Sequence, residues 1–212
     1  MLQTLDRFTV IEWVIKRLVK INCTKIICLP FKDIGSKLDT IIQKYSSNYL
    51  IDFGDQENVY ERVLNILLKN SIDMKSNLIR ICADRPFIEP LLIEHLSNEF
   101  NNKNELLFNH ISYKKNKIPR GFGAEIFSYK LFKNLYSKNI SDYHKEHMTS
   151  LIWENELIRK EFTLPKKYTF KKFINRKLNY DIDTDEDIYK IKKLIKNYSI
   201  TYNDSFLNEK AL

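Results

Sequence analysis

The sequence predicts an α/β fold with a mostly parallel, doubly wound sheet whose two faces are covered by helices. Two observations carry this prediction. Short apolar runs typical of buried strands alternate with segments whose apolar residues recur at helical spacing. The strand-like runs are also nearly continuous in apolar residues, as expected for parallel strands buried on both faces. Such alternation favours right-handed crossover connections, and therefore a parallel sheet.

The predicted elements follow one another along the first half of the chain. Apolar residues recur at helical spacing in residues 10–19, 38–42, 57–70 and 90–100, and strand-like runs fall in residues 25–30, 49–53, 77–82 and 105–109. Gly35 and Gly54 interrupt the pattern between elements, and Pro90 suits the first turn of a helix. We therefore expect helix, strand, helix, strand, helix, strand, helix and a further strand.

The second half of the chain is less regular. Gly121 and Gly123 flank one aromatic residue, which indicates backbone freedom near a ligand or a tight bend. A helix is expected from Ser141, and residues 178–183 resemble a strand. A further helix follows, capped by Thr184 with Asp187 at its third position. We expect one domain over residues 1–198 and a C-terminal tail, residues 199–212, which shows no firm pattern.

Charge and composition argue against several classes of protein. The net charge is +8 and the pI about 9.2, but the lysines are dispersed. The densest basic segment, residues 166–177, is interleaved with aromatic residues at strand-like spacing. No helix-turn-helix, zinc-finger or RNA-binding signature accompanies the charge, so we expect no nucleic-acid partner.

The same composition bears on location. No apolar run approaches the roughly 18 residues of a membrane span, and the acidic residues Asp6 and Glu12 argue against a signal peptide at the N-terminus. Three cysteines without the spacing of a disulfide framework indicate reduced thiols. We therefore expect a cytoplasmic protein with no membrane span.

Asp84 is the first candidate site residue. It follows the strand-like first half of residues 77–87, and Pro86 prevents a simple continuation of the sheet. Ligands of open α/β sheets bind beyond the carboxyl ends of the strands, where a carboxylate can hold a divalent cation against a polyphosphate. The alternative is that Asp84 caps the next helix or closes a turn.

His144 and His147 raise the question of a metal site, because they are three residues apart on an expected helix. No third ligand occurs at a standard spacing. Packing or hydrogen bonding is the better interpretation of this pair.

Five segments occur in the order and spacing of motifs from one enzyme family. Residues 54–62 are similar to G-[ST]-x-x-D-V-L-x-R, residues 83–88 to T-x-D-x-P-x-I, residues 119–127 to P-x-G-x-x-x-E-x-F, residues 145–149 to R-E-H-V-T and residues 183–187 to D-T-x-E-D. Together they resemble the cytidylyltransferase family. The most similar branch is the spore-coat polysaccharide biosynthesis protein F group, related to the enzymes that make CMP-sialic acid and CMP-Kdo. The resemblance covers residues 1–197.

The resemblance implies a Rossmann-like nucleotide-sugar transferase that joins a sugar to CTP with Mg²⁺ and releases pyrophosphate, for surface polysaccharide biosynthesis. The resemblance leaves the identity of the sugar open, and an acidic sugar of the 3-deoxy-ulosonic or sialic type is one candidate. Asp84 and Asp183 would be the catalytic carboxylates that hold the metal, since one or two carboxylates with phosphates and waters suffice for Mg²⁺. The expected partners are CTP and the sugar, with a homodimer as an assembly to consider.

The resemblance also implies two groups of binding residues. The nucleotide group comprises Gly54, Asp55, Glu57 and Arg85. The acceptor group comprises Arg120, Glu125, Glu146 and His147, and Arg120 or Arg85 could pair with a sugar carboxylate. Simpler interpretations stay open: Glu57 could cap its helix, Arg120 could be solvated, and Glu146 and His147 could serve packing.

One departure from the family pattern concerns the N-terminus. The family begins with a strand and a phosphate loop of the form G-S-x-R-L-P-x-K, followed by residues resembling 1–5 and 9–18 of this chain. The chain is therefore expected to be N-terminally truncated, through a misplaced start or a true loss of the loop. The alternative function is a non-catalytic member of the fold that acts as a partner-binding or regulatory subunit. A weaker third option is a nucleotidyltransferase for another base.

Overall fold

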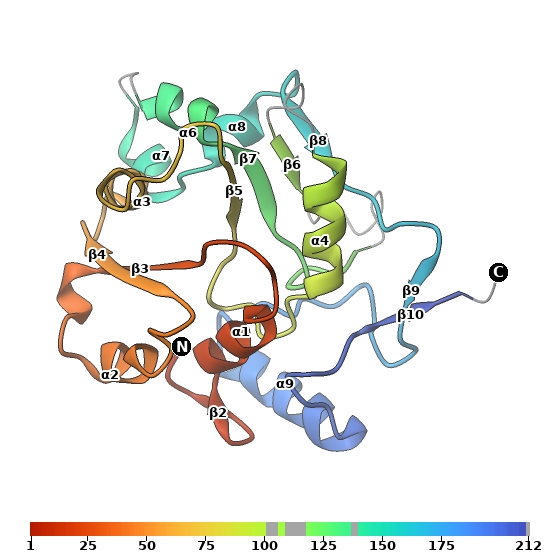
Figure 1. Ribbon diagram of the computed structural model, residues 1–212. Helices are drawn as coiled ribbons and strands as arrows, with labels where there is room; N and C mark the ends of the chain where they lie inside the picture. Colours follow the sequence, from red (N-terminus) through yellow and green to blue (C-terminus); the bar gives the residue numbers. More distant parts are fainter. Residues whose placement is uncertain (101–105, 109–117, 137–139, 211–212) are drawn as a thin grey trace.

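The computed structural model describes residues 1–100, 106–108, 118–136 and 140–210, and Figure 1 shows their arrangement. The strands are β1 (Thr4–Leu5), β2 (Phe8–Thr9), β3 (Ile26–Pro30), β4 (Leu50–Gly54), β5 (Asn77–Arg80), β6 (Leu106–Phe108), β7 (Glu125–Ser128), β8 (Arg159–Glu161), β9 (Tyr168–Phe170) and β10 (Leu207–Glu209). The helices are α1 (Val10–Leu18), α2 (Lys37–Gln43), α3 (Val59–Lys69), α4 (Pro90–Glu99), α6 (Tyr129–Tyr136), α7 (Asp142–Glu146), α8 (Ser150–Glu154) and α9 (Asp185–Tyr198), with a short 3₁₀ helix at Phe31–Asp33.

The alternation predicted for the first half of the chain is confirmed. β3, α2, β4, α3, β5 and α4 follow one another in that order. β3 and β4 pair in parallel, with Ile26 opposite Leu50 and Pro30 opposite Gly54. The helix between them crosses over from one strand to the next, as a parallel pair requires. The α/β class is therefore established by the described residues.

The second sheet is mixed in direction, contrary to the expectation of a mostly parallel sheet. Its order is β5-β7-β6-β8 (Figure 1), and β7 runs antiparallel to both β5 and β6, whereas β6 and β8 are parallel. Ile126 of β7 lies opposite Ile79 on one side and Leu107 on the other. The apolar residues of β7, Ile126 and Phe127, would be buried whichever way the strand runs, so the sequence pattern does not reveal its direction.

The strand expected at residues 178–183 is also not formed. Within the described residues, this segment makes a single bridge, which pairs Asn179 with Arg120. The amide of Tyr180 donates to the carbonyl of Arg120 at 3.1 Å, and the amide of Ile182 donates to the carbonyl of Asp84 at 2.9 Å. Because alternate amides bond to two different segments, no ladder develops. Through these two hydrogen bonds, the segment connects the residues that follow β5 with the residues that precede β7.

Helix α9 begins as the sequence predicts. The hydroxyl of Thr184 accepts from the Asp187 amide at 3.2 Å, and the Asp187 carboxylate accepts from the Thr184 amide at 3.0 Å. This reciprocal capping box satisfies backbone donors that the first helical turn leaves without partners. It fixes the point at which residues 180–183 end and the helix starts.

Residues after α9 pack into the largest core, although the sequence pattern predicts a tail from residue 199. Ile200, Phe206 and Leu207 are buried in the same cluster as residues of α1, α4 and α9. β10 pairs antiparallel with β9. These apolar residues follow neither a helical nor a strand period, so periodicity gives no signal for a segment that lies across the core surface.

Across the described residues, we find no helix that combines the length and apolar character needed to cross a membrane.

Candidate functional site

Three aspartates form a carboxylate cluster, defined here as Asp84, Asp181 and Asp183. The hydrogen bond from the Ile182 amide to the Asp84 carbonyl, 2.9 Å long, brings the two segments together. Oδ1 of Asp84 is buried and accepts no hydrogen bond from the described part of the chain. Burial raises the pKa of Asp84, and the carboxylates of Asp181 and Asp183 raise it further.

Two arginines hold the middle member of this cluster. Nε of Arg120 lies 2.5 Å from Oδ2 of Asp181, and Nε of Arg85 lies 3.3 Å from Oδ1 of the same carboxylate. Nη2 of Arg120 also lies 3.7 Å from Oδ2 of Asp183. Nη1 of Arg85 donates to the carbonyl of Gly123 at 2.9 Å. Arg85 is thus buried within the protein, whereas Arg120 has a side chain that is 58% exposed.

Gly121 makes this arrangement possible. Its φ of +95° lies in the region that favours glycine. A Cβ at this position would lie 2.6 Å from the carbonyl carbon of Tyr180 and 2.9 Å from the amide nitrogen of Asp181. A side chain here would therefore push Asp181 away from Arg120. The sequence predicted backbone freedom near a ligand or a tight bend, and Gly121 forms a tight bend packed against the backbone of Tyr180.

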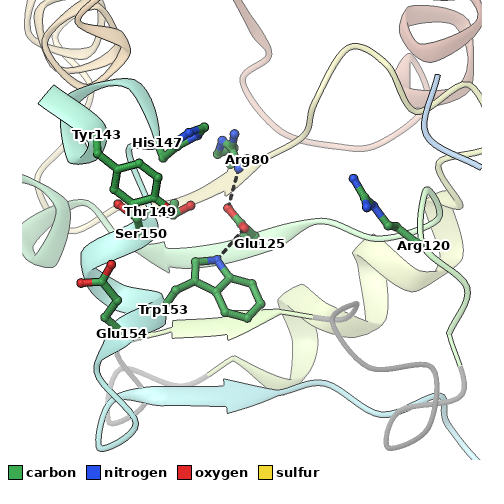
Figure 2. Close-up of a pocket in the computed structure, with 9 residues that line it drawn as sticks. All are labelled: Arg80, Arg120, Glu125, Tyr143, His147, Thr149, Ser150, Trp153 and Glu154. Carbon is green, nitrogen blue, oxygen red and sulfur yellow. Dashed lines mark hydrogen bonds and ion pairs between the residues drawn. The ribbon is translucent and has the colours of Figure 1, made fainter. Parts of the chain in front are cut away.

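A cavity of about 500 Å³ is called the first cavity, and Figure 2 shows the residues that line it. It is lined by Arg80, Arg120, Glu125, Tyr143, His147, Thr149, Ser150, Trp153 and Glu154. Three of the four residues expected on the acceptor side, Arg120, Glu125 and His147, come together here. Arg120 belongs to both the cavity and the ion-pair network of the carboxylate cluster.

Glu125 is held rigidly at the wall of the first cavity. Oε2 pairs with Nη1 of Arg80 at 3.0 Å, and Oε1 accepts from the indole nitrogen of Trp153 at 3.0 Å (Figure 2). Burial alone would raise its pKa, but the Arg80 guanidinium and the hydrogen bond from Trp153 hold the pKa of Glu125 below its usual value. Glu125 is therefore ionised and fixed in orientation.

A second cavity, of about 370 Å³, lies between α3 and α7. It is lined by Asp55, Glu57, Asn58, Glu61, Asp142, Tyr143, Lys145 and Glu146. Asp55 and Glu57 are thus together, as expected for a nucleotide group. Glu146 lines this second cavity, whereas the resemblance placed it with the acceptor residues of the first. The reason is its position on α7, a helix that contacts α3.

The local structure gives Asp55 and Gly54 structural roles, but it does not make Glu57 the cap of its helix. Oδ1 of Asp55 accepts from the amides of Glu57 and Asn58, at 2.9 and 2.6 Å, and so shapes the turn that leads into α3. Asn58 is the residue that caps α3, and Glu57 does not. Gly54 has a packing role, because a Cβ there would lie 2.6 Å from Cγ of Arg62.

Several residues of the site were not predicted from the sequence. Asp181 stands two residues before Asp183, and this D-x-D spacing was an available signal. Arg80 is the last residue of β5, and Trp153 and Tyr143 lie on the short helices α8 and α7. No motif marks these three residues, since they reach the cavities only through tertiary packing.

His144 and His147 have partners other than a metal. Nδ1 of His144 lies 2.6 Å from the hydroxyl of Ser150, and the ring of His147 packs edge-on against Tyr143. In the described ranges, no group of three or more His, Cys, Asp or Glu side chains is arranged to hold a metal ion. The carboxylate cluster nevertheless suits a cation that phosphates and waters also ligate, because the described residues give the buried Oδ1 of Asp84 no hydrogen bond.

Several solved structures share the fold of this chain. A cytidylyltransferase from Leptospira borgpetersenii serovar Hardjo-bovis aligns with a TM-score of 0.80 at 21% identity, over 97% of this chain and 82% of that one. A 4-diphosphocytidyl-2C-methyl-D-erythritol synthase from Anaerococcus prevotii aligns with a TM-score of 0.60 at 14% identity, over 91% and 88%. CMP:2-keto-3-deoxy-manno-octonic acid synthetase, solved with CTP, aligns with a TM-score of 0.60 at 12% identity, over 93% and 91%. The chain thus has the α/β fold of cytidylyltransferase structures.

Sequence comparison gives the family itself. The family model described as cytidylyltransferase matches residues 2–210, and the chain therefore belongs to the cytidylyltransferase family. The resemblance seen in the five motifs is confirmed. The uncharacterized protein MJ1063 of Methanocaldococcus jannaschii is 28% identical over 148 residues, which are 69% of this chain. The matched region spans 56% of the length of that protein.

Proposed function

We propose that this protein is a CTP-dependent sugar cytidylyltransferase that forms a CMP-sugar and releases pyrophosphate, for surface polysaccharide synthesis. The observation that carries the proposal is the position of Arg120, which pairs with the carboxylate cluster and also lines the first cavity. The reaction requires phosphate chemistry directly beside a bound sugar. Arg120 joins two such places within a protein of the cytidylyltransferase family.

In the proposed reaction a sugar hydroxyl attacks the α-phosphorus of CTP, a new oxygen–phosphorus bond forms, and the bond to pyrophosphate breaks. Asp84 and Asp183 would hold Mg²⁺. When bound, that ion would offset the negative charge that develops on the phosphate oxygens. Asp181, which is 2% exposed, would hold Arg120 and Arg85 in place rather than contact substrate.

The first cavity is proposed as the sugar site. Its exposed guanidinium, Arg120, could pair with the carboxylate of an acidic sugar. Glu125 could accept hydrogen bonds from sugar hydroxyls because it is ionised and fixed, and Trp153 offers an aromatic surface. Arg85 is less suited to this role than expected, because it is buried against Asp181 and Gly123.

The second cavity is proposed as the site of the cytidine part of CTP. Its lining is rich in carboxylates, among them Asp55, Glu57 and Glu61. Carboxylates accept hydrogen bonds from an exocyclic amino group and from ribose hydroxyls, whereas they would repel a triphosphate. We therefore assign this cavity to the nucleoside and the region of the carboxylate cluster to the phosphates.

The test is pyrophosphate release from CTP and Mg²⁺ with a panel of sugars that includes 2-keto-3-deoxy sugar acids, sialic acids and neutral hexoses. We expect release with one class and loss of release in Asp84→Asn. Glu99→Gln removes an exposed carboxylate of α4 that lines neither cavity and is the matched control. Release in Asp84→Asn at the wild-type rate would overturn the assignment of Asp84. Absence of CTP binding to the wild-type chain would overturn the proposed function.

A further inference from the structure

Tyr143 occupies a unique position among the described residues that line the two cavities. It is the one side chain that lines both of them. Although aromatic, it is 58% exposed. An exposed aromatic side chain that lines two cavities can stack on a flat ligand such as a pyrimidine or on the apolar face of a sugar. The position alone therefore places one ring within reach of two ligands.

The ring of Tyr143 is linked to groups in the first cavity. It packs edge-on against His147, with ring centroids 4.6 Å apart, and against His144 at 5.4 Å. His144 is itself fixed, since Nδ1 lies 2.6 Å from the hydroxyl of Ser150 and Nε2 lies 3.7 Å from Glu154. His147, Ser150 and Glu154 all line the first cavity. A ligand that contacts them would change what the Tyr143 ring packs against.

The backbone of Tyr143 is linked to the second cavity. Its neighbours on α7, Asp142, Lys145 and Glu146, line that cavity. The helix is only one turn long, begins at the Ser141 cap and contacts α3, which carries Glu61. So short a helix has few backbone hydrogen bonds of its own, and a ligand between α3 and α7 would set its position.

We propose that Tyr143 is a positioning residue that couples the two cavities, so that a ligand stacked against its ring in one cavity changes the affinity of the other. This inference rests on the proposed function, which assigns the second cavity to the nucleoside and the first to the sugar. Coupling is reciprocal, so the nucleotide should change sugar affinity by the same factor as the sugar changes nucleotide affinity. We expect a factor of about five or more.

The experiment is a calorimetric titration of the full chain with CMP, alone and in the presence of each sugar of the panel, and the reverse titrations. Tryptophan fluorescence gives a second readout, because Trp153 lines the first cavity and the other tryptophan, Trp13, is 1% exposed. Tyr143→Phe keeps the ring, and Tyr143→Ala removes it. Tyr189→Ala is the matched control, since it removes a tyrosine of α9 that is 67% exposed and lines neither cavity.

We expect the wild type, Tyr143→Phe and Tyr189→Ala to show the same coupling factor. Tyr143→Ala should bind CMP and the sugar independently, with an unfolding midpoint close to that of the control. Two ligands that bind the wild type without coupling would overturn the inference and leave the proposed function standing. Coupling that survives in Tyr143→Ala, or that disappears in Tyr143→Phe, would also overturn the inference and leave the proposed function standing. Failure of CMP, or of every sugar, to bind the wild type would overturn both proposals.

Discussion

Nε of Arg120 lies 2.5 Å from Oδ2 of Asp181, and this contact joins an exposed guanidinium to a carboxylate that is 2% exposed. Arg85 holds the other oxygen of Asp181 from inside the protein. A carboxylate buried at this depth is stabilised only while its cationic partners remain. Asp181 is therefore the buried partner of this ion pair, and Arg120 is the exposed partner, which we propose contacts the substrate.

This difference predicts unequal effects on stability. Asp181→Asn removes the buried carboxylate that Arg85 and Arg120 both contact, and it should lower the free energy of unfolding by about 3–5 kcal/mol. Arg120→Gln leaves Asp181 paired with Arg85 and removes a mostly exposed partner, so it should cost about 1 kcal/mol or less. Urea unfolding of the two variants measures both values. Equal losses would show that the exposed arginine is as important for the fold as the buried one.

Asp84→Asn should abolish activity without lowering the stability of the fold. Burial and the nearby carboxylates raise the pKa of Asp84, so the ionised group is disfavoured in the folded protein. Replacing it by a neutral amide relieves this repulsion, and the unfolding free energy at pH 7 should stay the same or rise by up to about 1 kcal/mol. Pyrophosphate release should be lost. A large loss of stability would show instead that Asp84 closes the turn, the simpler interpretation of its position.

The sequence and the structure agree where short-range physics decides the outcome. Helical spacing locates α1, α3 and α9, and the capping box at Thr184 forms as predicted, because each depends on neighbours within one or two turns. The direction of β7 and the irregular path of residues 178–183 depend on pairing between distant segments. The burial of Phe206 depends in the same way on contacts with α1 and α4, which no local period records.

In the candidate site, too, the residues marked by motifs were predicted, and those that depend on contacts between distant segments were not. The motifs led to Asp84, Asp183, Arg120 and Glu125, and the structure brings all four to the carboxylate cluster or the first cavity. Arg80 and Trp153 were not predicted, because their importance comes from the two bonds that they make to Glu125. Glu146 was expected on the acceptor side and lines the other cavity. Its place is decided by the packing of α7 against α3, which the motif does not encode.

Glu125 should make stability depend on pH in the acid range. Its pKa is held below the usual value of 4.5 in the folded protein, so it stabilises the fold above that value. The contribution is lost as the pH falls through the lowered pKa. Glu125→Gln should cost about 1–3 kcal/mol at pH 7, since Arg80 loses its charged partner, and should flatten the acid limb of the stability profile. Parallel pH profiles for the two proteins below pH 4.5 would contradict this account.

Gly121→Ala should disturb the site through the backbone. The positive φ costs about 1–3 kcal/mol for a residue with a side chain, and the new Cβ would also meet the Tyr180 backbone at 2.6 Å. Gly35→Ala is a matched control, because Gly35 also has a positive φ, of +71°, but a Cβ there would have no atom within 4 Å. Thermal unfolding should show the larger loss for Gly121→Ala. Only that variant should also lower pyrophosphate release, since only it displaces Asp181.

Arg17 and Glu89 should hold the C-terminal segment against the core. Their side chains are 1% exposed and lie 3.6 Å apart. Arg17 donates to the carbonyls of Tyr202 and Asp204, and Glu89 accepts from the amide of Phe206 at 2.7 Å. Burial lowers the pKa of Arg17 to about 10 and raises that of Glu89, so the attraction between them does not fully offset their desolvation.

Arg17→Met should therefore lower the free energy of unfolding by about 3–5 kcal/mol, because it leaves Glu89 buried without a cation. The double variant Arg17→Met with Glu89→Gln removes both charges and keeps an oxygen that can accept from the Phe206 amide, so it should recover part of the loss. Urea unfolding gives the free energies, and limited proteolysis should cut within residues 199–210 fastest in the single variant. If the single and double variants were equally unstable, the cost would lie in the lost hydrogen bonds to Tyr202 and Asp204 rather than in the unpaired charge.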